Sequence, residues 1–300
     1  MRYPKPVTPA DVFVIHYDTR DDLERCLARL NTHAPEARVH VLHTGPEDQA
    51  YAQATETTYG VRWLDTENHS YSHACNVAFR HCDGPICTIM NADAFIESDT
   101  LERMARPFQG ERVAVTGPKI VTADGTPQRQ GLPYALETRG LKADEDRDVS
   151  WISGCLFAVN MEAVADIGGF DPSLRFGNED LEFSLRARDH GWRNVMVGAT
   201  ATHLGGTSTP DAPPFWVEGL RGSMLLDARR AGALRREAHR LGLQAVALWQ
   251  RRFGPERNRE GWQAVARMTR RKRYDVSPFA DTLAEVRDDF PQHWPPEANA

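Results

Sequence analysis

Short apolar runs alternate with helical patterns through the first two-thirds of this sequence, and this alternation restricts the fold more than any other feature. The first run, residues 11–16, precedes a helical pattern with one apolar face, formed by Leu23, Leu27 and Leu30. Further strand patterns follow at residues 38–42, 60–64 and 85–90. Strands that alternate with helices pair mostly in parallel and carry helices on both faces of the sheet. The sequence therefore predicts an α/β fold with a mostly parallel central sheet.

The composition is that of a folded protein. The 300 residues are 41% hydrophobic, which suffices for one large core and a smaller addition to it. No run reaches the roughly 18 to 20 apolar residues that a membrane span needs, and residues 1–9 lack the apolar core of a signal peptide. We therefore expect a soluble protein of the cytoplasm.

The cysteines and histidines give no sign of a structural metal or of disulfides. The five cysteines are odd in number and lack CxxC spacing, so we expect reduced thiols. His69 and His73 lie four residues apart and could share a helix face, but they have no acidic or cysteine partner nearby. We expect no zinc site and interpret them as surface or base-contacting side chains.

The net charge of -6 hides a basic segment near the C-terminus. Residues 221–273 hold 15 lysines and arginines against four acids, a local charge of about +11. A solvated helical face explains such a segment, and so does contact with an anionic membrane at its inner face or with a phosphate-bearing acceptor. Nucleic acid is not expected as a partner, because the segment contains no recognisable binding module and the rest of the chain is acidic.

Polar side chains stand where two of the predicted strands end. Asn91 and Asp93, with Ala92 between them, follow the apolar run at residues 85–90, and His203 ends a later extended stretch. Alone, the acid is an ordinary turn residue, and the histidine is an ordinary core or surface residue. Sites in open α/β sheets form at strand ends, however, so these side chains together suggest a metal site.

A second acidic pair opens a predicted helix. Glu179 and Asp180 begin a pattern in which one stripe is formed by Leu181, Leu185 and Arg188. Acids in a first helical turn complement the helix dipole, and Asn178 is placed to cap the free amides. The same dipole keeps a carboxylate ionised, as a catalytic base must be. Both interpretations stay open on these residues alone.

The middle of the chain is less regular. Residues 112–116 and 119–121 are predicted as short strands around residues 117–118, and residues 123–126 (ADGT) as a tight turn. Residues 128–147 are polar and lack periodicity. A mobile substrate loop and a plain surface loop both fit this segment.

A set of short motifs carries a resemblance to a known family. They are residues 113–119 (VAVTGPK), 124–127 (DGTP), 149–154 (VSWISG), 168–171 (GGFD), 177–193 (GNEDLEFSLRARDHGWR) and 203–208 (HLGGTS). In this order and spacing they resemble the family 2 glycosyltransferases of the GT-A fold, most closely the bacterial rhamnosyltransferase-like members. The resemblance covers about residues 11–232. It implies an inverting, metal-dependent transferase that moves a sugar from a nucleotide-diphosphate donor to a hydroxyl of a glycan or lipid-linked glycan precursor, as in polysaccharide biosynthesis.

The resemblance also implies roles for the polar residues at the strand and helix ends. Asn91 and Asp93 match the DxD position, where Asp93 would bind Mg²⁺ or Mn²⁺, and His203 matches a further metal ligand. Glu179 and Asp180 match the family's ED pair, in which Asp180 would deprotonate the acceptor hydroxyl. Asn91 supplies an amide oxygen where the family's first Asp supplies a charge, which implies weaker metal binding.

The donor and acceptor residues follow from the same comparison of motifs. The residues matched to donor-binding positions are His16, Tyr17, Asp18, Thr44, Asn76, Asn91, Ala92 and Asp93. Residues 41–45 (VLHTG) lack the usual Asp at the end of strand two, so the resemblance does not identify the nucleobase. Trp151, Ser153 and Gly154 match acceptor-binding positions, although a tryptophan beside an apolar strand fits the core equally well.

The domain organisation is expected to be bipartite. Residues 1–210 would form the GT-A catalytic domain, with a nucleotide-binding half at about 11–120 and an acceptor and catalytic half at about 121–210. Residues 211–300 would form a helical subdomain with an acidic tail. Its apolar patterns are Leu220, Met224 and Ala228, then Leu243, Val246, Ala247 and Trp249, and in the tail Phe279, Leu283 and Val286. Acceptor docking, membrane contact and homodimerisation are all compatible with such helices.

Two alternatives come from other classes of protein. Asn91 and the missing strand-two Asp are compatible with a catalytically silent GT-A module that binds nucleotide or glycan as a partner subunit. A sugar nucleotidyltransferase is the other alternative, but residues 16–20 (HYDTR) show no glycine-rich phosphate loop after the first strand.

Overall fold

The computed structural model describes residues 11–110, 112–128, 132–205 and 212–277. Its strands form one mixed sheet with the order β3-β2-β1-β4-β8-β6-β9-β5, and β7 pairs with β9. The strands are β1 Asp11–His16, β2 Arg38–His43, β3 Arg62–Asp65, β4 Ile86–Asn91, β5 Ala94–Phe95, β6 Val113–Val121, β7 Arg147–Val149, β8 Leu156–Asn160 and β9 Arg193–His203. Parallel pairs join β3, β2, β1 and β4 in a row and join β6 to β9, whereas β8, β5 and β7 pair antiparallel.

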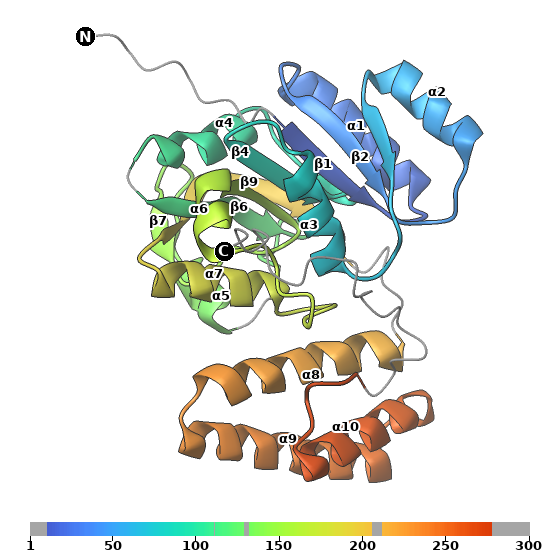
Figure 1. Cartoon of the computed structure of the whole chain (residues 1–300), viewed down its shortest axis with the longest axis vertical. Helices are drawn as coiled ribbons and strands as arrows, with labels where there is room; N and C mark the ends of the chain where they lie inside the picture. The colour runs from blue at the N-terminus through green and yellow to red at the C-terminus, as the bar shows by residue number, and fades with distance from the viewer. Residues whose placement is uncertain (1–10, 111, 129–131, 206–211, 278–300) are drawn as a thin grey trace, which may run out of the picture.

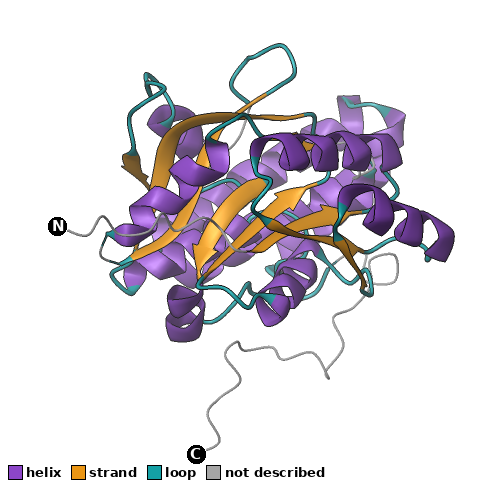
Figure 2. Ribbon diagram, turned by 90° about the horizontal axis from the view of Figure 1, so that it is seen from above, coloured by secondary structure: helices purple, strands orange, loops and turns teal. Residues whose placement is uncertain are grey.

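Helices cover both faces of this sheet, as Figure 2 shows. They are α1 Arg20–His33, α2 Gln49–Tyr59, α3 Tyr71–His81, α4 Thr100–Ala105, α5 Leu132–Glu137, α6 Met161–Ile167 and α7 Glu179–Asp189. Successive strand side chains point to opposite faces. In β1, Val12 and Val14 therefore pack in one core cluster with α1 and α4, whereas Phe13 packs in the other with α3, α6 and α7. The predicted α/β fold is confirmed, as is the buried face of α1.

A helical unit follows the sheet domain. Its helices are α8 Pro213–Arg230, α9 Ala233–Phe253 and α10 Arg259–Arg271, which lie together at one end of the molecule in Figure 1. They share a third core cluster, to which Leu174 of the sheet domain also contributes. The expected boundary at residue 210 and the apolar pattern of the tail lie outside the described residues.

Several local expectations were wrong. The two short strands predicted around residues 117–118 are one strand, β6, with a register shift between Gly117 and Lys119. The segment 128–147 is not simply a loop where it is described, because it contains α5 and β7, and Tyr134 is buried with its hydroxyl accepting the Ile120 N–H. His69 and His73 are both buried, and His69 precedes α3 rather than sharing its face.

The apolar patterns of two helices were also assigned to the wrong faces. In α7 the buried residues are Glu179, Glu182, Phe183, Ser184 and Ala187, not the stripe that begins at Leu181. In α9 only Leu243 and Ala247 of the predicted patch are buried, and Val246 and Trp249 are exposed. Periodicity shows that a helix has an apolar side but does not show which element covers it.

All five cysteines are unpaired, and four of them are buried, which confirms the expected thiols. No helix within the described ranges is long and apolar enough to cross a membrane.

Candidate active site

A cleft of about 640 Å³ opens at the carboxyl ends of β1, β2 and β4. Its wall combines side chains from distant parts of the sequence, among them Tyr17, Thr44, Asn68, Ser70, Tyr71, Asn91, Gln128, Ser153, Gly154, Phe176, Glu179, Asp180, His203, Phe215 and Trp216. Strand ends, the start of α7 and the start of α8 therefore meet at one place. This is the location that an open α/β sheet offers to a ligand.

Asp180 lies at the N-terminal end of α7 with its carboxylate held by the backbone. Its Oδ2 accepts the N–H of Gly154 at 2.8 Å, and its Oδ1 accepts the N–H of Leu181 at 2.7 Å. Burial raises the pKa of Asp180 to about 6, although these two N–H groups oppose the shift. The carboxylate is thus held in one orientation and is a better proton acceptor than an ordinary aspartate near neutral pH.

Glu179 differs from its neighbour in both contacts and ionisation. Its side chain is buried, and its Oε2 has no hydrogen-bond partner among the described residues. Burial, followed by repulsion from Asp180 and Glu218, raises the pKa of Glu179 well above its usual value. Glu179 therefore favours its protonated form, which leaves Asp180 as the member of the pair that ionises first.

The turn before α7 contains two residues in the left-handed backbone conformation, and no side chain in the described part of the turn caps the helix. Gly177 and Asn178 have φ values of 81° and 73°. Asn178 makes no side-chain cap of α7, contrary to the expectation from sequence. Its amide instead donates to the carbonyl of Gly219 in α8 at 2.8 Å. The helix that carries the acidic pair is thereby joined directly to the C-terminal helical unit.

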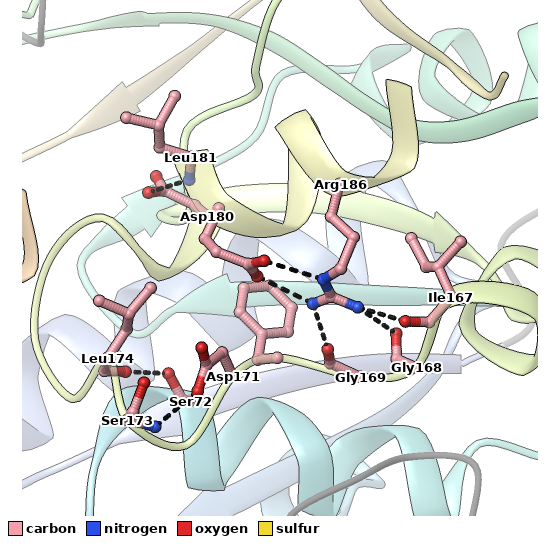
Figure 3. A network of polar contacts seen from close by, with 12 residues as sticks. Ser72, Ile167, Gly168, Gly169, Asp171, Ser173, Leu174, Asp180, Leu181 and Arg186 are labelled. Atoms are coloured by element: carbon pink, nitrogen blue, oxygen red, sulfur yellow. Dashed lines mark hydrogen bonds and ion pairs between the residues drawn. The ribbon is translucent and has the colours of Figure 1, made fainter. Parts of the chain in front are cut away.

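Arg186 holds α7 against the preceding turn, as Figure 3 shows. Its guanidinium pairs with Glu182 one turn earlier at 2.9 Å. It also donates to the carbonyl of Gly169 at 2.6 Å and to those of Ile167 and Gly168. These contacts fix the orientation of the helix whose first residues enter the cleft.

Asn91, Asp93 and His203 converge from the ends of β4 and β9. His203 Nε2 lies 3.1 Å from Asp93 Oδ1 and 3.4 Å from Asn91 Nδ2, and its Nδ1 lies 3.0 Å from Gln128 Oε1. Burial by itself lowers the pKa of His203, but its hydrogen bond and charge interaction with Asp93, helped by Cys155, raise it to about 10.

This group fits a divalent cation in its donor atoms, provided that the ion displaces the proton that His203 shares with Asp93. A carboxylate, an amide oxygen and an imidazole nitrogen are ligands that Mn²⁺ accepts, whereas Mg²⁺ prefers oxygen alone. In the described part of the chain no three His, Cys, Asp or Glu side chains gather as a metal cluster. The candidate set has only two of these, so a bound ion would need further ligands from a diphosphate or from water.

Some of the predicted donor-binding residues line the cleft, and others do not. Tyr17, Thr44 and Asn91 line the cleft. Asn76 is buried and exchanges hydrogen bonds of 2.9 and 2.8 Å with the backbone of Phe170, which is a structural role. Ala92 is buried in the core, and Asp18 is exposed with a φ of 45°.

His16 belongs to a closed chain of hydrogen bonds behind the cleft. The N–H of Thr19 donates to His16 Nε2 at 3.2 Å, so the His16 proton is on Nδ1 and donates to His43 Nδ1 at 3.0 Å. His43 Nε2 then donates to the carbonyl of Pro46 at 2.9 Å. Burial, with repulsion from His43 and Arg20, lowers the pKa of His16 to about 3. The His16 ring is therefore neutral, each of these ring nitrogens has a hydrogen-bond partner, and His16 supports the loop that carries Tyr17.

Two of the three predicted acceptor-binding residues line the cleft, and the third does not. Ser153 and Gly154 line the cleft, whereas Trp151 is 8% exposed and packs in the core against Tyr134 with ring centroids 5.5 Å apart. Sequence reasoning missed the aromatic wall opposite, where Phe176 and Phe215 meet edge to face at 5.4 Å beside Trp216. Two adjacent aromatic residues at the start of a helix were the available signal.

The fold and this cleft together define a class of protein, the transferases with the GT-A fold. The family model described as "Glycosyl transferase family 2" matches residues 11–168, which is more than half of the chain. The protein therefore belongs to glycosyl transferase family 2.

Comparison with solved structures supports the fold assignment. The chain is similar to the "Crystal structure of GalNAc-T7 with UDP, GalNAc and Mn2+", with a TM-score of 0.57 and 16% sequence identity. The match covers 73% of this chain and 48% of that one, so the chain spans about half of the neighbour's length. No curated protein matches the sequence.

Proposed function

We propose that this protein is an inverting, metal-dependent glycosyltransferase that moves a sugar from a nucleotide-diphosphate donor to a hydroxyl of a glycan or lipid-linked glycan precursor. The observation that carries the proposal is the position of Asp180. This oriented carboxylate shares one cleft with Asn91 and His203. A base and a candidate metal group on the same cleft are what displacement of a diphosphate by a hydroxyl requires.

The proposed mechanism assigns a task to each group of residues. Asp180 accepts the proton of the acceptor hydroxyl, and that oxygen attacks the anomeric carbon from the face opposite the leaving diphosphate, so the configuration inverts. Asn91, Asp93 and His203 would hold Mn²⁺ or Mg²⁺, whose charge stabilises the departing diphosphate. The structural neighbour GalNAc-T7 was solved with UDP and Mn²⁺, which favours manganese.

Tyr17, Thr44 and Asn68 are proposed to contact the nucleotide. They line the cleft with two hydroxyl groups and an amide. His16, Asp18, Asn76 and Ala92, which the sequence motifs also placed in the donor site, would support this wall from behind or beside it. The nucleobase would then be recognised without a carboxylate.

The acceptor is proposed to bind between Ser153 and Gly154 on one side and the aromatic wall of Phe176, Phe215 and Trp216 on the other. Aromatic faces pack against the apolar faces of sugar rings. This wall lies on the same cleft as Asp180. A rhamnosyltransferase-like specificity agrees with the sequence motifs and is part of the proposal.

A thermal-shift panel of UDP, dTDP, GDP and CMP, each with and without Mn²⁺, tests this function. We expect one diphosphate to raise the melting temperature in the presence of metal only, because a ligand that binds the native state stabilises it. Asp93→Ala should lose this shift relative to its own baseline. Asp83→Ala removes an acid whose side chain is 80% exposed and should keep it.

If no nucleotide stabilises the wild type, the transferase proposal fails. If nucleotide binds but no sugar is transferred from any donor, the silent GT-A module becomes the better hypothesis. Asn91 and the missing strand-two Asp are the features that favour that module.

A further inference from the structure

The outward side of α9 is apolar, although nothing in the described structure covers it. In an ordinary surface helix the apolar residues face the core. In α9 only Leu243 and Ala247 are buried. Leu234 is 87% exposed, Trp249 58% and Phe253 66%.

These residues lie along one side of the helix. Leu234, Leu241 and Leu248 recur at every seventh position, which is close to two helical turns, and Ala238 and Ala245 lie between them. Leu241 and Leu248 are each about half exposed. Trp249 and Phe253 extend the same side toward the end of the helix, with their rings 6.0 Å apart. We call this set of seven residues the outer face of α9.

The outer face points away from the catalytic sheet. In Figure 1, α9 lies on the far side of α8 from the sheet. Packing against α8 and α10 uses the opposite side of α9, where Leu243 and Ala247 join the core of the helical unit. The outer face is therefore free to meet a large flat partner without blocking the cleft.

Cations border this face, and almost no negative charge does. Arg251 and Arg252 are exposed residues of α9, and Arg235 is exposed as well but lies 3.4 Å from Asp227 of α8. Glu237 is the one acid of the helix, and it is already paired with Arg240 and Lys272. Arg252 also lies over the Phe253 ring, 5.2 Å from its centroid. The partner should therefore have negative charges at its surface and an apolar layer below them.

We propose that the outer face of α9 binds the surface of a bilayer that contains anionic phospholipids. Exposed tryptophan, phenylalanine and leucine beside arginines are the composition of a helix that lies in the membrane interface. The arginines near the two ends of this face oppose a second copy of this chain, because pairing two such faces would bring like charges together. They favour anionic headgroups, since each arginine near such a surface strengthens binding about fivefold.

This inference does not depend on the proposed sugar transfer, because vesicle binding is measured without donor, acceptor or metal. The full chain is sedimented with vesicles of phosphatidylcholine alone and of phosphatidylcholine with phosphatidylglycerol. We expect binding to the second kind only. At 1 M salt, where charges are screened beyond about 3 Å, the bound fraction should fall.

One variant of the outer face, one variant of the arginines beside it and one matched control make the test specific. Trp249→Gln/Phe253→Gln should weaken vesicle binding about tenfold or more, because both rings lose apolar contact with lipid. Arg251→Gln/Arg252→Gln should weaken it about 25-fold. Leu136→Gln changes a residue of α5 that is 60% exposed and should leave binding unchanged. All changed side chains are exposed, so each variant should melt at the temperature of the wild type.

Three results would overturn the proposal. The first is a wild-type protein that does not sediment with anionic vesicles. The second is binding that the two α9 variants do not weaken. The third is a wild-type dimer, seen by light scattering after gel filtration, that Trp249→Gln/Phe253→Gln converts to monomers without any lipid binding, which would assign the face to a second copy.

Discussion

At the scale of single residues, Glu179 and Asp180 show how different surroundings give two neighbouring carboxyl groups different pKa values. Asp180 has two backbone N–H partners, whereas the Oε2 of Glu179 has none among the described residues. Both pKa values rise, and that of Asp180 rises only to about 6 because its N–H partners favour the charged form. The pair is thus arranged for one member to lose its proton near neutral pH while the other keeps it.

We expect turnover to rise with pH through about 6, because Asp180 must be ionised to accept a proton. Asp180→Asn should lower kcat about 10²- to 10⁴-fold and leave the affinity for the donor nearly unchanged. Initial rates of donor consumption from pH 5 to 8 measure both effects. Asp189→Asn, at the other end of α7 and paired with Arg230 at the surface, is the matched control and should retain the rate.

The raised pKa of Asp180 has the opposite effect on stability: turnover should rise with pH, whereas the contribution of Asp180 to the free energy of unfolding should fall. A carboxyl whose folded pKa lies above its unfolded value stabilises the fold in its protonated form, and this contribution is lost as the pH rises from 3.8 through about 6. Asp180→Asn should therefore melt no lower than wild type at pH 7. A variant with lost turnover and a lowered melting temperature would indicate a folding defect instead of a lost base.

Sequence reasoning located the cleft residues better than it assigned their contacts. The side chains of Asn91, Asp180 and His203 were expected at element ends, and the structure places them on one cleft. Trp151 and Asn76 were assigned to substrates, but their partners are Tyr134 and the backbone of Phe170. Such contacts join residues far apart in the chain, so spacing in the sequence does not reveal them.

At the scale of elements, Gly117 explains why β6 continues where a break was predicted. A Cβ at this glycine would lie 2.3 Å from Ile152 Cγ2 and 3.1 Å from the carbonyl of Leu156. The strand therefore passes close beneath the segment that carries Ser153 and Gly154. The sequence pair Gly-Pro indicated a turn, whereas in the fold the glycine permits close packing and the strand absorbs the irregularity as a register shift.

We expect Gly117→Ala to lower the free energy of unfolding by about 1–3 kcal/mol, because the added methyl overpacks the core. Urea unfolding measures this change. Turnover should fall as well, since a shifted Ile152 moves the Gly154 N–H that orients Asp180.

Two controls separate this clash from the general effect of adding a methyl. Adding Ile152→Ala to Gly117→Ala removes the Cγ2 that clashes with the new methyl. The double variant should therefore lose less free energy of unfolding than the sum of the losses of the two single variants. Gly242→Ala adds a methyl in α9 with nothing within 4 Å and should be neutral or stabilising by up to about 1 kcal/mol. Equal destabilisation by both glycine changes would contradict the packing argument.

The alternation of strands and helices was predictable because each element buries a periodic face of its own. The buried sides of α7 and α9 were not predictable, because they depend on which neighbour covers the helix. In α7 the polar residues Glu179, Glu182 and Ser184 are buried beside Phe183. A sequence pattern assigns such residues to solvent, but in the fold Glu182 pairs with Arg186 and Ser184 accepts the N–H of Ile152, so both are buried.

At the scale of the whole molecule, the helical unit forms part of the wall of the candidate active site. Phe215, Trp216 and Gly219 of α8 line the cleft, and Gly219 accepts the amide of Asn178. A Cβ at Gly222 would lie 3.0 Å from both the Asn178 amide and the Gly177 carbonyl. The close approach of α8 therefore helps to hold the turn that presents the acidic pair.

Arg221 joins this unit to the sheet domain from a fully buried position. Its side chain, 2% exposed, pairs with Glu218 and donates to the carbonyl of Ser173 before α7 and to that of Tyr274 after α10. Charge counting had assigned Arg221 to a basic surface along residues 221–273. Arg221 is buried and is not part of that surface. A count of charges along the sequence does not distinguish buried arginines from exposed ones.

We expect Arg221→Leu to lower the free energy of unfolding by about 3–5 kcal/mol, because it leaves Glu218 buried without a counter-charge. Arg229→Leu is the matched control on the same helix, since Arg229 contacts Asp171 and Ser173 with its side chain 45% exposed. That pair is partly exposed to solvent and should contribute only about 0–1 kcal/mol. Urea unfolding of both variants gives the comparison.

The double variant Glu218→Gln/Arg221→Leu identifies the cause of the loss. Removing the buried charge together with its partner should recover a large part of the stability, because the penalty comes from the unpaired carboxylate. Acceptor affinity should remain lower than in wild type, since α8 carries Phe215 and Trp216 and loses its ties to Ser173 and Tyr274. If Arg221→Leu unfolds no more easily than Arg229→Leu, then the unit is held to the sheet domain by apolar packing around Leu174, and Arg221 does not determine its position.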